Sequence, residues 1–342
     1  MRLKVALLND SFPPTIDGVA NATFNYADIL TKNHNCQSVV ITPKYPNITD
    51  NYPFQVFRYR SMKTFKKIGY RAGDPTDLVT ISRLRKMHFD LVHVHCPFVS
   101  ALIANEVVLG RRRKAPVVFT YHTKFGIDID ERFKGEAFRA VAKRFVLSNI
   151  YRSDEVWVVS EGAGKDLRQL GYQGGYRVME NGTDFPRTTV TQEGLDRFNS
   201  QHNLAGDDFM LLFVGRIVWC KNLRLILDGL KHVRDAGLKF RMFFVGDGYD
   251  LPAVKQYARQ LGLTDSITFP GKIIDREELK GYFCRANLFL FPSTYDTSGL
   301  VVKEAAACAC PSLLVRGSCA AEGGEDGMSG FLCEETAEDF AK

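Results

Sequence analysis

The sequence predicts an α/β protein with two domains in tandem, each built on a parallel sheet with helices on both faces. Its 342 residues exceed the usual length of one domain. Short apolar runs of strand length alternate with longer helical patterns, as they do in βαβ units. A polar stretch that ends near residue 208 interrupts this alternation, which then starts again. We therefore expect one domain over residues 1–184 and a second over residues 185–342.

The first domain is predicted from apolar runs that each end in polar or small residues. Strands are expected at residues 3–8, 37–42, 90–95, 117–121 and 154–159, and helices near 20–31 and, basic and amphipathic, near 131–151. Residues 43–75, rich in Tyr, Lys and Pro, are predicted to form an irregular insertion. In a parallel sheet, ligands bind at the carboxyl ends of the strands. Those ends are occupied by Asp17, Gly18, His95, His122 and Glu161.

The second domain follows the same pattern. Strands are expected at residues 209–214, 240–245, 266–269 and 288–291, with a further strand that ends at 315. Helices are expected to end near 236, to run over 251–261 and 276–283, to follow residue 299, and to begin again at 337–342. The stretch before residue 208 is too weakly patterned to predict an element.

Residues 291–311 combine the features of a ligand site. An apolar strand ends there, and Thr297 and Ser298 offer hydroxyl groups that could cap the helix that follows Gly299. Unpaired N–H groups at a helix start attract phosphate. Asp296 lies just before this helix and Glu304 lies inside it. The alternative interpretation is an ordinary α/β crossover with a surface acid at each end, and this stretch alone does not decide between the two.

Composition excludes several classes of protein. With 45% hydrophobic and 25% charged residues, the chain is typical of globular proteins. No apolar run approaches the roughly 20 residues of a membrane-spanning helix. Asn9 and Asp10 interrupt the first apolar run, so it predicts a strand rather than a signal peptide. Eight cysteines without a CxxC pair or zinc-ligand spacing indicate free thiols in a reducing compartment. We therefore expect a cytoplasmic protein.

Charge is distributed unevenly along the chain. Residues 1–180 hold 27 Lys and Arg against 17 Asp and Glu, a net charge of +10, whereas residues 181–342 hold 18 against 22, a net charge of −4. A basic first half suggests an anionic partner, for which nucleic acid and an anionic membrane both qualify. Solvated surface lysines are the simpler explanation of any single cluster. His93 and His95 are interpreted as packing at the end of their strand.

Several short motifs follow one another in a specific order. They are Asp17-Gly18-Val19, Tyr121-His122-Thr123, Asn181-Gly182-Thr183-Asp184, Val214-Gly215-Arg216 with Lys221-Asn222, Val245-Gly246-Asp247-Gly248, Phe269-Pro270-Gly271, and the segment from Asp296 to Glu304. Each is weak alone, but in this order they resemble family 4 of the retaining glycosyltransferases, over essentially the whole chain. The first two motifs are similar to those of the branch that contains diacylglycerol glucosyltransferases and lipid-acceptor mannosyl- and sulfoquinovosyltransferases.

The resemblance implies the GT-B fold, in which two Rossmann-like domains face each other across a cleft. The donor, a UDP-sugar with UDP-glucose as the first expectation, would bind the C-terminal domain, and a glycolipid, diacylglycerol or carbohydrate acceptor the N-terminal one. An anionic membrane surface is a further expected partner, which would hold the protein peripherally on the inner face of the cell membrane. No cofactor, metal or nucleic acid is implied.

The resemblance also implies roles for individual residues. Arg216 and Lys221 would clamp the donor diphosphate, and Asp296, where the family has Glu, would contact the sugar. His122 would lie at the edge of the donor sugar and, with these three, form the catalytic set. The remaining donor-binding residues would be Gly18, Ile273, Thr297, Ser298, Gly299, Leu300 and Glu304, and the acceptor-binding residues would be Asp17 and Glu161.

Three functional hypotheses remain at this point. The first is a retaining glycosyltransferase, with a UDP-sugar donor or, as an alternative, GDP-mannose. The second is a non-transferring sugar-nucleotide enzyme on the same fold, and the third is a binding module without turnover. We further expect the C-terminal domain to be short at its end, because the family's last helix crosses back to the first domain and no residue follows Lys342.

Overall fold

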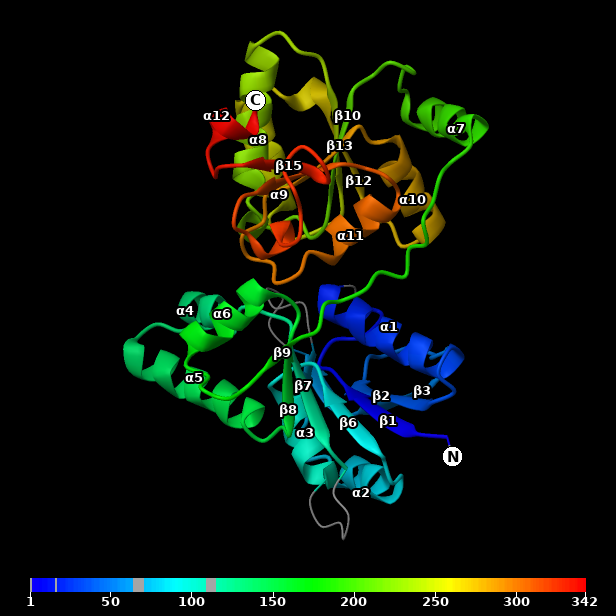
Figure 1. The fold of residues 1–342 in the computed structure, drawn as a ribbon, viewed down its shortest axis with the longest axis vertical. Helices are drawn as coiled ribbons and strands as arrows, with labels where there is room; N and C mark the ends of the chain where they lie inside the picture. Colours follow the sequence, from blue (N-terminus) through cyan, green and yellow to red (C-terminus); the bar gives the residue numbers. More distant parts are fainter. Residues whose placement is uncertain (1, 16, 64–70, 109–114) are drawn as a thin grey trace. The chain divides into compact units, whose positions relative to one another are not determined.

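The computed structural model describes residues 2–15, 17–63, 71–108 and 115–342. The chain divides into two compact units, Met1–Asn181 and Gly182–Lys342, and each is an α/β structure (Figure 1). This division lies close to the boundary that we placed after residue 184. The two parallel sheets confirm the predicted fold class of two Rossmann-like domains.

The first unit is built on one parallel sheet, whose described strands have the order β3-β2-β1-β6-β7-β8-β9. These strands are β1 (Lys4–Leu8), β2 (Gln37–Pro43), β3 (Gln55–Tyr59), β6 (Leu91–Val94), β7 (Val117–Tyr121), β8 (Glu155–Val158) and β9 (Arg177–Val178). An antiparallel pair, β4 (Ser61–Lys63) and β5 (Arg71–Gly73), lies outside this sheet. The helices are α1 (Gly18–Lys32), α2 (Leu78–Lys86), α3 (Val99–Val108), α4 (Phe125–Arg132), α5 (Glu136–Ile150) and α6 (Glu161–Leu170).

Both faces of this sheet are buried, as its apolar strands require. Successive side chains of a strand point to opposite faces. Val5 and Leu7 of β1 belong to the cluster that includes Ala27 of α1, whereas Ala6 and Leu8 belong to a larger cluster with residues of α3, α5 and α6. Helices on both faces leave the carboxyl ends of the strands as the place where polar loops gather.

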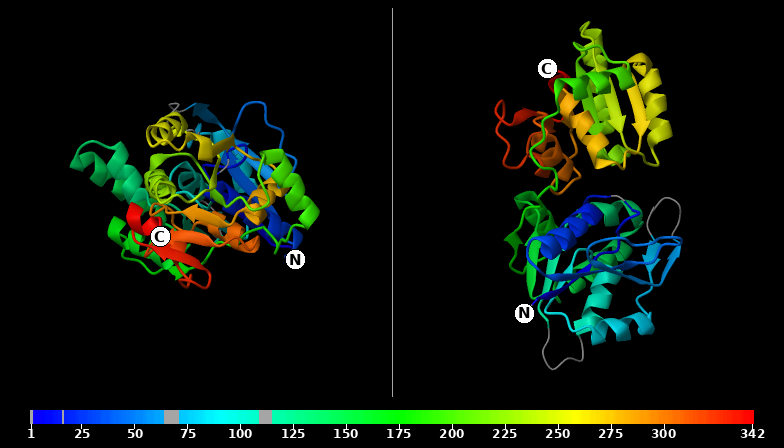
Figure 2. Two further views of the ribbon diagram at one scale, coloured as in Figure 1. Left: turned by 90° about the horizontal axis from the view of Figure 1, so that it is seen from above. Right: turned by 90° about the vertical axis from the view of Figure 1, so that its right-hand side faces the viewer.

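The second unit has a parallel sheet in the strand order β12-β11-β10-β13-β14-β15 among the described residues, and its strands are visible side by side in Figure 2. They are β10 (Met210–Val214), β11 (Arg241–Val245), β12 (Ile267–Gly271), β13 (Leu288–Phe291), β14 (Ser312–Val315) and β15 (Gly330–Cys333). The α-helices are α7 (Gln192–His202), α8 (Leu223–Asp235), α9 (Leu251–Gln260), α10 (Arg276–Arg285), α11 (Leu300–Ala307) and α12 (Ala337–Phe340). Short 3-10 turns cover Trp219–Lys221, Thr264–Ser266 and Cys319–Ala321.

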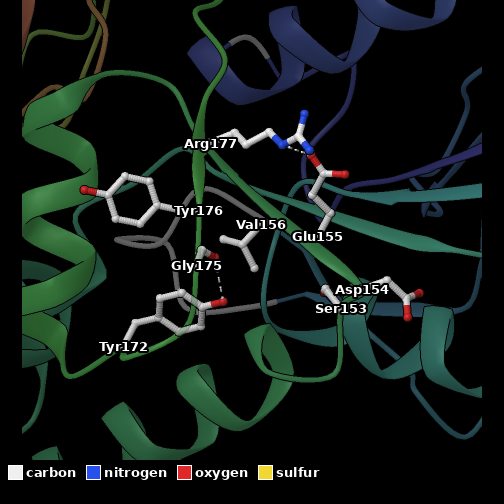
Figure 3. A pocket seen from close by; sticks show the side chains of 8 residues that line it. All are labelled: Ser153, Asp154, Glu155, Val156, Tyr172, Gly175, Tyr176 and Arg177. Atoms are coloured by element: carbon white, nitrogen blue, oxygen red, sulfur yellow. Dashed lines mark hydrogen bonds and ion pairs between the residues drawn. The ribbon is translucent and has the colours of Figure 1, made fainter.

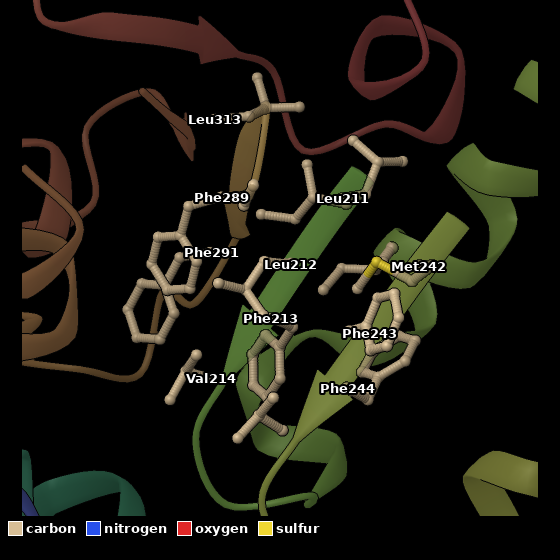
Figure 4. Close-up of a cluster of buried hydrophobic side chains, with 14 of the residues drawn as sticks. Leu211, Leu212, Phe213, Val214, Met242, Phe243, Phe244, Phe289, Phe291 and Leu313 are labelled. Atoms are coloured by element: carbon tan, nitrogen blue, oxygen red, sulfur yellow. The ribbon is translucent and has the colours of Figure 1, made fainter. Parts of the chain in front are cut away.

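Aromatic side chains fill the core of the second unit. Figure 4 shows Phe213 and Phe244 together with Phe289 and Phe291 on the central strands. The ring centroids of Phe213 and Phe291 are 6.2 Å apart, and those of Phe289 and Phe291 are 5.7 Å apart. A buried aromatic side chain contributes on the order of 2–3 kcal/mol through apolar burial. These strands therefore form a rigid support for the loops at their carboxyl ends.

Several segments differ from the sequence-based prediction, and β9 and β15, for example, were not predicted. Of the insertion expected over residues 43–75, residues 64–70 lie outside the described part of the chain. The rest is not wholly irregular, because β3 pairs with β2 at the edge of the main sheet and β4 pairs with β5; the half-exposed residues of β3 weakened the strand pattern. The helix expected over residues 131–151 is present as α5 but begins at Glu136, because Gly135 has a φ of 97°, outside the helical region; residues 131 and 132 are the end of α4. Helix α7 forms in the stretch whose pattern was too weak to predict an element; it buries only Phe198, so its apolar pattern is faint.

In the described part of the chain, no helix combines the length and apolar character needed to cross a membrane. All eight cysteines lie within the described residues, and each is a free thiol.

Candidate active site

Two glycine-containing loops pack against each other at the carboxyl ends of β10 and β11. Gly246 has a φ of 139°, and a Cβ atom there would lie 1.9 Å from the carbonyl oxygen of Gly215. The backbone N–H of Gly215 donates to the carbonyl of Val245 over 3.0 Å. This close approach requires glycine. The motifs that contain Gly215 and Gly246 therefore form one shelf, on which Arg216 is exposed.

Lys221 and Asp296, whose side chains are 10% and 22% exposed, form an ion pair at the edge of this shelf. Lys221 belongs to the turn before α8, and its Nζ donates to Oδ1 of Asp296 in the loop after β13. Asn222 holds the two loops together by donating from Nδ2 to the carbonyl of Pro292 over 3.3 Å. Arg216 acts on the same carboxylate through its charge. The structure thus brings together three of the four residues predicted to be catalytic.

The charge of Asp296 is maintained despite its burial. Burial would raise the pKa of this carboxyl, but the charge and hydrogen bond of Lys221, a hydrogen bond with Ser293 and the charge of Arg216 outweigh it, so the pKa is lowered. Oδ2 of Asp296 is buried and accepts no hydrogen bond from the described residues. An ionised oxygen of this kind is suited to accept a hydrogen bond from a ligand hydroxyl.

Helix α11 begins in a different way from the prediction. Its N-cap is Gly299, with a φ of 58°, so neither Thr297 nor Ser298 is the N-cap residue. A left-handed residue is needed to turn the chain from the loop into the helix, and glycine takes that conformation without strain. Gly299 has no side chain that could cap the helix, and backbone N–H groups in a first helical turn, which here starts at Leu300, can bind an anion.

Glu304 lies inside α11 and is held by a residue that the sequence analysis missed. Arg276, the first residue of α10, donates from Nη1 to Oε1 of Glu304 over 3.1 Å and from Nη2 to Asp184. Its guanidinium also lies 4.1 Å from the ring centroid of Phe185. The only sequence signal was its place after the loop that contains Ile273, at the carboxyl end of β12. Arg276 therefore orients Glu304.

Burial raises the pKa of Glu304, and the charge of Arg276 partly opposes this shift. Glu304→Ala should weaken nucleotide binding by roughly 1–3 kcal/mol, because ligand hydroxyls lose their acceptor. With Arg276→Ala, the pKa of Glu304 should rise further, so that the carboxylate is lost and nucleotide affinity falls at a higher pH than in the parent. Titration calorimetry with UDP from pH 5 to 8 measures both effects.

Glu277→Ala is the matched control, because Glu277 is an exposed acid in the same first turn of α10. It should leave UDP affinity unchanged at every pH. Unchanged affinity in Glu304→Ala would show that the nucleotide does not use this helix.

In the first unit, Asp17 and Gly18 mark the start of α1. Oδ1 of Asp17 accepts hydrogen bonds from the backbone N–H groups of Val19 and Ala20 over 2.9 and 2.8 Å, so Asp17 is the N-cap of this helix. Gly18 is exposed, and a Cβ atom there would meet open space. The capping role of Asp17 uses one of the oxygens that we had assigned to acceptor binding.

His122 and Glu161 occupy the neighbouring strand ends. His122 follows β7 and is buried, and its Nε2 lies 2.9 Å from Nδ1 of His95, which follows β6. Burial lowers the pKa of His122 to about 3, so the ring is neutral near pH 7. Glu161 is the exposed first residue of α6, after the N-cap Ser160. His95 was interpreted as packing only, and its bond to His122 was not foreseen.

The pocket in Figure 3 lies at the amino ends of β8 and β9, away from the carboxyl ends of the strands. It has a volume of about 350 Å³ and is lined by residues at the start of β8 and β9, including Glu155, Tyr172, Tyr176 and Arg177. Arg177 and Glu155 pair over 3.0 Å across it. The lining contains none of the predicted site residues. No group of three or more His, Cys, Asp or Glu within the described ranges is arranged to hold a metal ion.

Comparison with known families identifies both halves of the chain. Residues 16–187 match the family described as Glycosyltransferase Family 4, and residues 196–342 match the family described as Glycosyl transferases group 1. The first match covers half of the chain. The chain belongs to glycosyltransferase family 4. It is therefore a glycosyltransferase, which removes the non-transferring enzyme and the binding module from the hypotheses above.

Individual relatives of this glycosyltransferase span most of its length. The alpha-monoglucosyldiacylglycerol synthase of Streptococcus pneumoniae is 25% identical over 317 residues, 90% of this chain and 70% of the relative. That of Acholeplasma laidlawii is 21% identical over 354 residues, 98% of this chain and 86% of the relative. The crystal structure of Anabaena Alr3699/HepE in complex with UDP and glucose matches with a TM-score of 0.73 at 18% identity, over 99% of this chain and 88% of that one. The last likeness confirms the GT-B fold.

Proposed function

We propose that this glycosyltransferase moves a hexose from a UDP-sugar to a hydroxyl group of diacylglycerol or a glycolipid, with retention at the anomeric carbon. UDP-glucose is the first candidate donor. The observation that carries the proposal is the cluster of Arg216, Lys221 and Asp296, of which Asp296 lies in the loop that leads into α11. The names of the two synthases support a lipid acceptor, and the UDP complex of the Anabaena structure supports a UDP donor.

The chemistry follows from these groups. As the bond between the anomeric carbon and the β-phosphate oxygen breaks, negative charge grows on the departing diphosphate. Arg216, Lys221 and the N–H groups of α11 stabilise that charge. The acceptor oxygen attacks the same face of the sugar, and its proton passes to the departing phosphate oxygen, so the configuration is retained. Asp296 and His122 contact the hexose that is transferred, and Glu304 binds the ribose of the nucleotide.

Nucleotide release across a panel of donors tests the proposal. Purified protein is supplied with UDP-glucose, UDP-galactose or GDP-mannose, each with and without diacylglycerol in detergent micelles. We expect acceptor-dependent release of UDP from UDP-glucose and an α-linked product by NMR. Nucleotide release from GDP-mannose and not from the UDP-sugars would show that GDP-mannose is the donor. A β-linked product would refute retention, and nucleotide release that does not depend on lipid would refute a lipid acceptor.

We further propose that α5 docks this enzyme peripherally on an anionic membrane. Phe138, Val141 and Phe145 recur at helical spacing and are 68%, 67% and 41% exposed. The helix also carries Arg139, Lys143 and Arg144 against one acid, Glu136. An exposed apolar stripe beside basic residues is typical of helices that lie in a membrane interface.

Replacing Arg139, Lys143 and Arg144 together by alanine should weaken sedimentation with phosphatidylglycerol-containing vesicles by about tenfold. Each cation near an anionic surface contributes on the order of 1 kcal/mol, but Asp130 already pairs with Lys143 over 2.9 Å and offsets part of that attraction. Lys231, Lys239 and Arg259 of the second unit are the control set and should change nothing when replaced. Equal sedimentation of the parent with anionic and neutral vesicles would point to a soluble acceptor.

A further inference from the structure

Two buried histidines at adjacent strand ends share a hydrogen bond that the mechanism above does not use. Nδ1 of His95 and Nε2 of His122 are 2.9 Å apart, and their ring planes are 28° apart with centroids 5.2 Å from each other. They follow β6 and β7, which are paired neighbours in the sheet. The sheet therefore fixes the position of one ring relative to the other.

His95 has no access to a substrate of its own. Its side chain is 1% exposed, packed against the rings of His93 at 4.1 Å and Tyr26 at 5.5 Å. Nε2 of His95 is buried and has no hydrogen-bond partner in the described part of the chain. Any effect of His95 on the reaction must therefore pass through His122.

Both rings are neutral, so each carries one N–H and one bare nitrogen. Burial lowers the pKa of His95 well below its usual value, with smaller contributions from His93 and His122, and burial lowers that of His122 to about 3. One of the two bonded nitrogens must donate and the other accept. If His122 donated, the proton of His95 would lie on its buried Nε2, as an N–H without a partner. Buried N–H groups of this kind are rarer than under-satisfied acceptors.

We propose that His95 is a positioning residue that donates from Nδ1 to Nε2 of His122 and so keeps the proton of His122 on Nδ1. The partner of one imidazole nitrogen determines the state of the other. In this tautomer, His122 presents an N–H donor, which is suited to an oxygen atom of the sugar or phosphate. This consequence rests on the proposed role of His122 in the reaction, whereas the tautomer itself does not.

The test compares His95→Leu, which removes the donor, with His95→Asn, whose amide nitrogen can replace Nδ1. We expect His95→Leu to lower kcat by about tenfold with little change in donor KM, because a hydrogen bond to the reacting complex is lost. His95→Asn should recover most of that loss. A kcat of His95→Leu equal to that of the parent would overturn the proposal, as would a loss in His95→Asn as large as in His95→Leu.

His93→Leu is the matched control. His93 is equally buried and stacks on His95, but its Nε2 bonds Thr120 over 2.7 Å rather than His122. It should lower the melting temperature about as much as His95→Leu and leave kcat unchanged. If both variants lowered kcat in proportion to their melting temperatures, His95 would serve stability alone.

The ¹⁵N NMR spectrum of histidine-labelled protein reads the tautomer without any turnover. The signals of His122, assigned by their loss in His122→Gln, should report a proton on Nδ1 in the parent and a mixture in His95→Leu. A proton on Nε2 in the parent would overturn the proposal. Full activity of His122→Gln would instead remove the role proposed for His122 in the reaction, and the tautomer would still be decided by the spectrum.

Discussion

Replacing Arg216 and Lys221 together by alanine should lower kcat/KM for the sugar donor by about 10³-fold or more, roughly 4 kcal/mol of transition-state stabilisation. These residues supply the two cations that the structure brings to the start of α11. Charge on the diphosphate grows only as the glycosidic bond breaks. The loss should therefore be larger in kcat than in the affinity for the intact UDP-sugar, which initial-rate kinetics and calorimetry measure separately.

Stability must be separated from catalysis in this variant, because Lys221 is the partner of the largely buried carboxylate of Asp296. Removing one member of a buried ion pair costs about 3–5 kcal/mol of folding stability. Arg216 is exposed, so Arg216→Ala alone should keep the melting temperature and still lose about 10²-fold in kcat/KM. Normal turnover by this folded variant would show that the diphosphate binds elsewhere.

The control for charge is Lys239→Ala with Arg259→Ala. Both residues are exposed. Lys239 lies just before β11 and Arg259 lies at the end of α9, so both are near the amino ends of the strands. The pair removes the same charge from the same unit. Its kcat/KM should equal that of the parent at all salt concentrations.

Asp296→Asn should lower kcat by about 10²-fold while changing donor KM much less. The substitution keeps the shape of the side chain and removes its charge, which Lys221 and Arg216 maintain in the parent. Oδ2, which no described residue satisfies, is then no longer an ionised acceptor for a sugar hydroxyl. An interaction that strengthens as the sugar distorts and gains charge affects turnover more than ground-state binding. Initial rates over a range of UDP-glucose concentrations separate the two constants.

Asp296→Glu distinguishes charge from length. The extra methylene enters a buried site, where overpacking costs on the order of 1–3 kcal/mol. Because the charge is kept, we expect this variant to retain more turnover than Asp296→Asn. If Asp296→Glu were the less active of the two, the pocket would be shaped around the shorter side chain. A raised KM with unchanged kcat in Asp296→Asn would reassign this residue to donor binding.

Sequence by itself determined the fold class, most strands and helices, and the family. Buried parallel strands are read from continuous apolar runs, such as residues 209–214, because both faces of the sheet are covered. Gly215 and Gly246 can also be recognised in the sequence, because only glycine allows the backbones of two loops to come this close. Two elements with a weakly apolar face were not predicted. Strand β3 is stabilised by pairing at the edge of the sheet, and helix α7 buries a single side chain.

The tertiary structure alone decided which residues act together. Lys221 and Asp296 are 75 residues apart in the chain, Arg276 and Glu304 are 28 apart, and His95 and His122 are 27 apart. No local pattern encodes these pairs, because each depends on how neighbouring strands of a parallel sheet bring their carboxyl-end loops together. The protonation states of these side chains follow from their burial and from partners on other loops. Residue types therefore predicted which loops hold the functional side chains. The tertiary structure decided which of their atoms, such as Oδ2 of Asp296, are not used by contacts within the described residues.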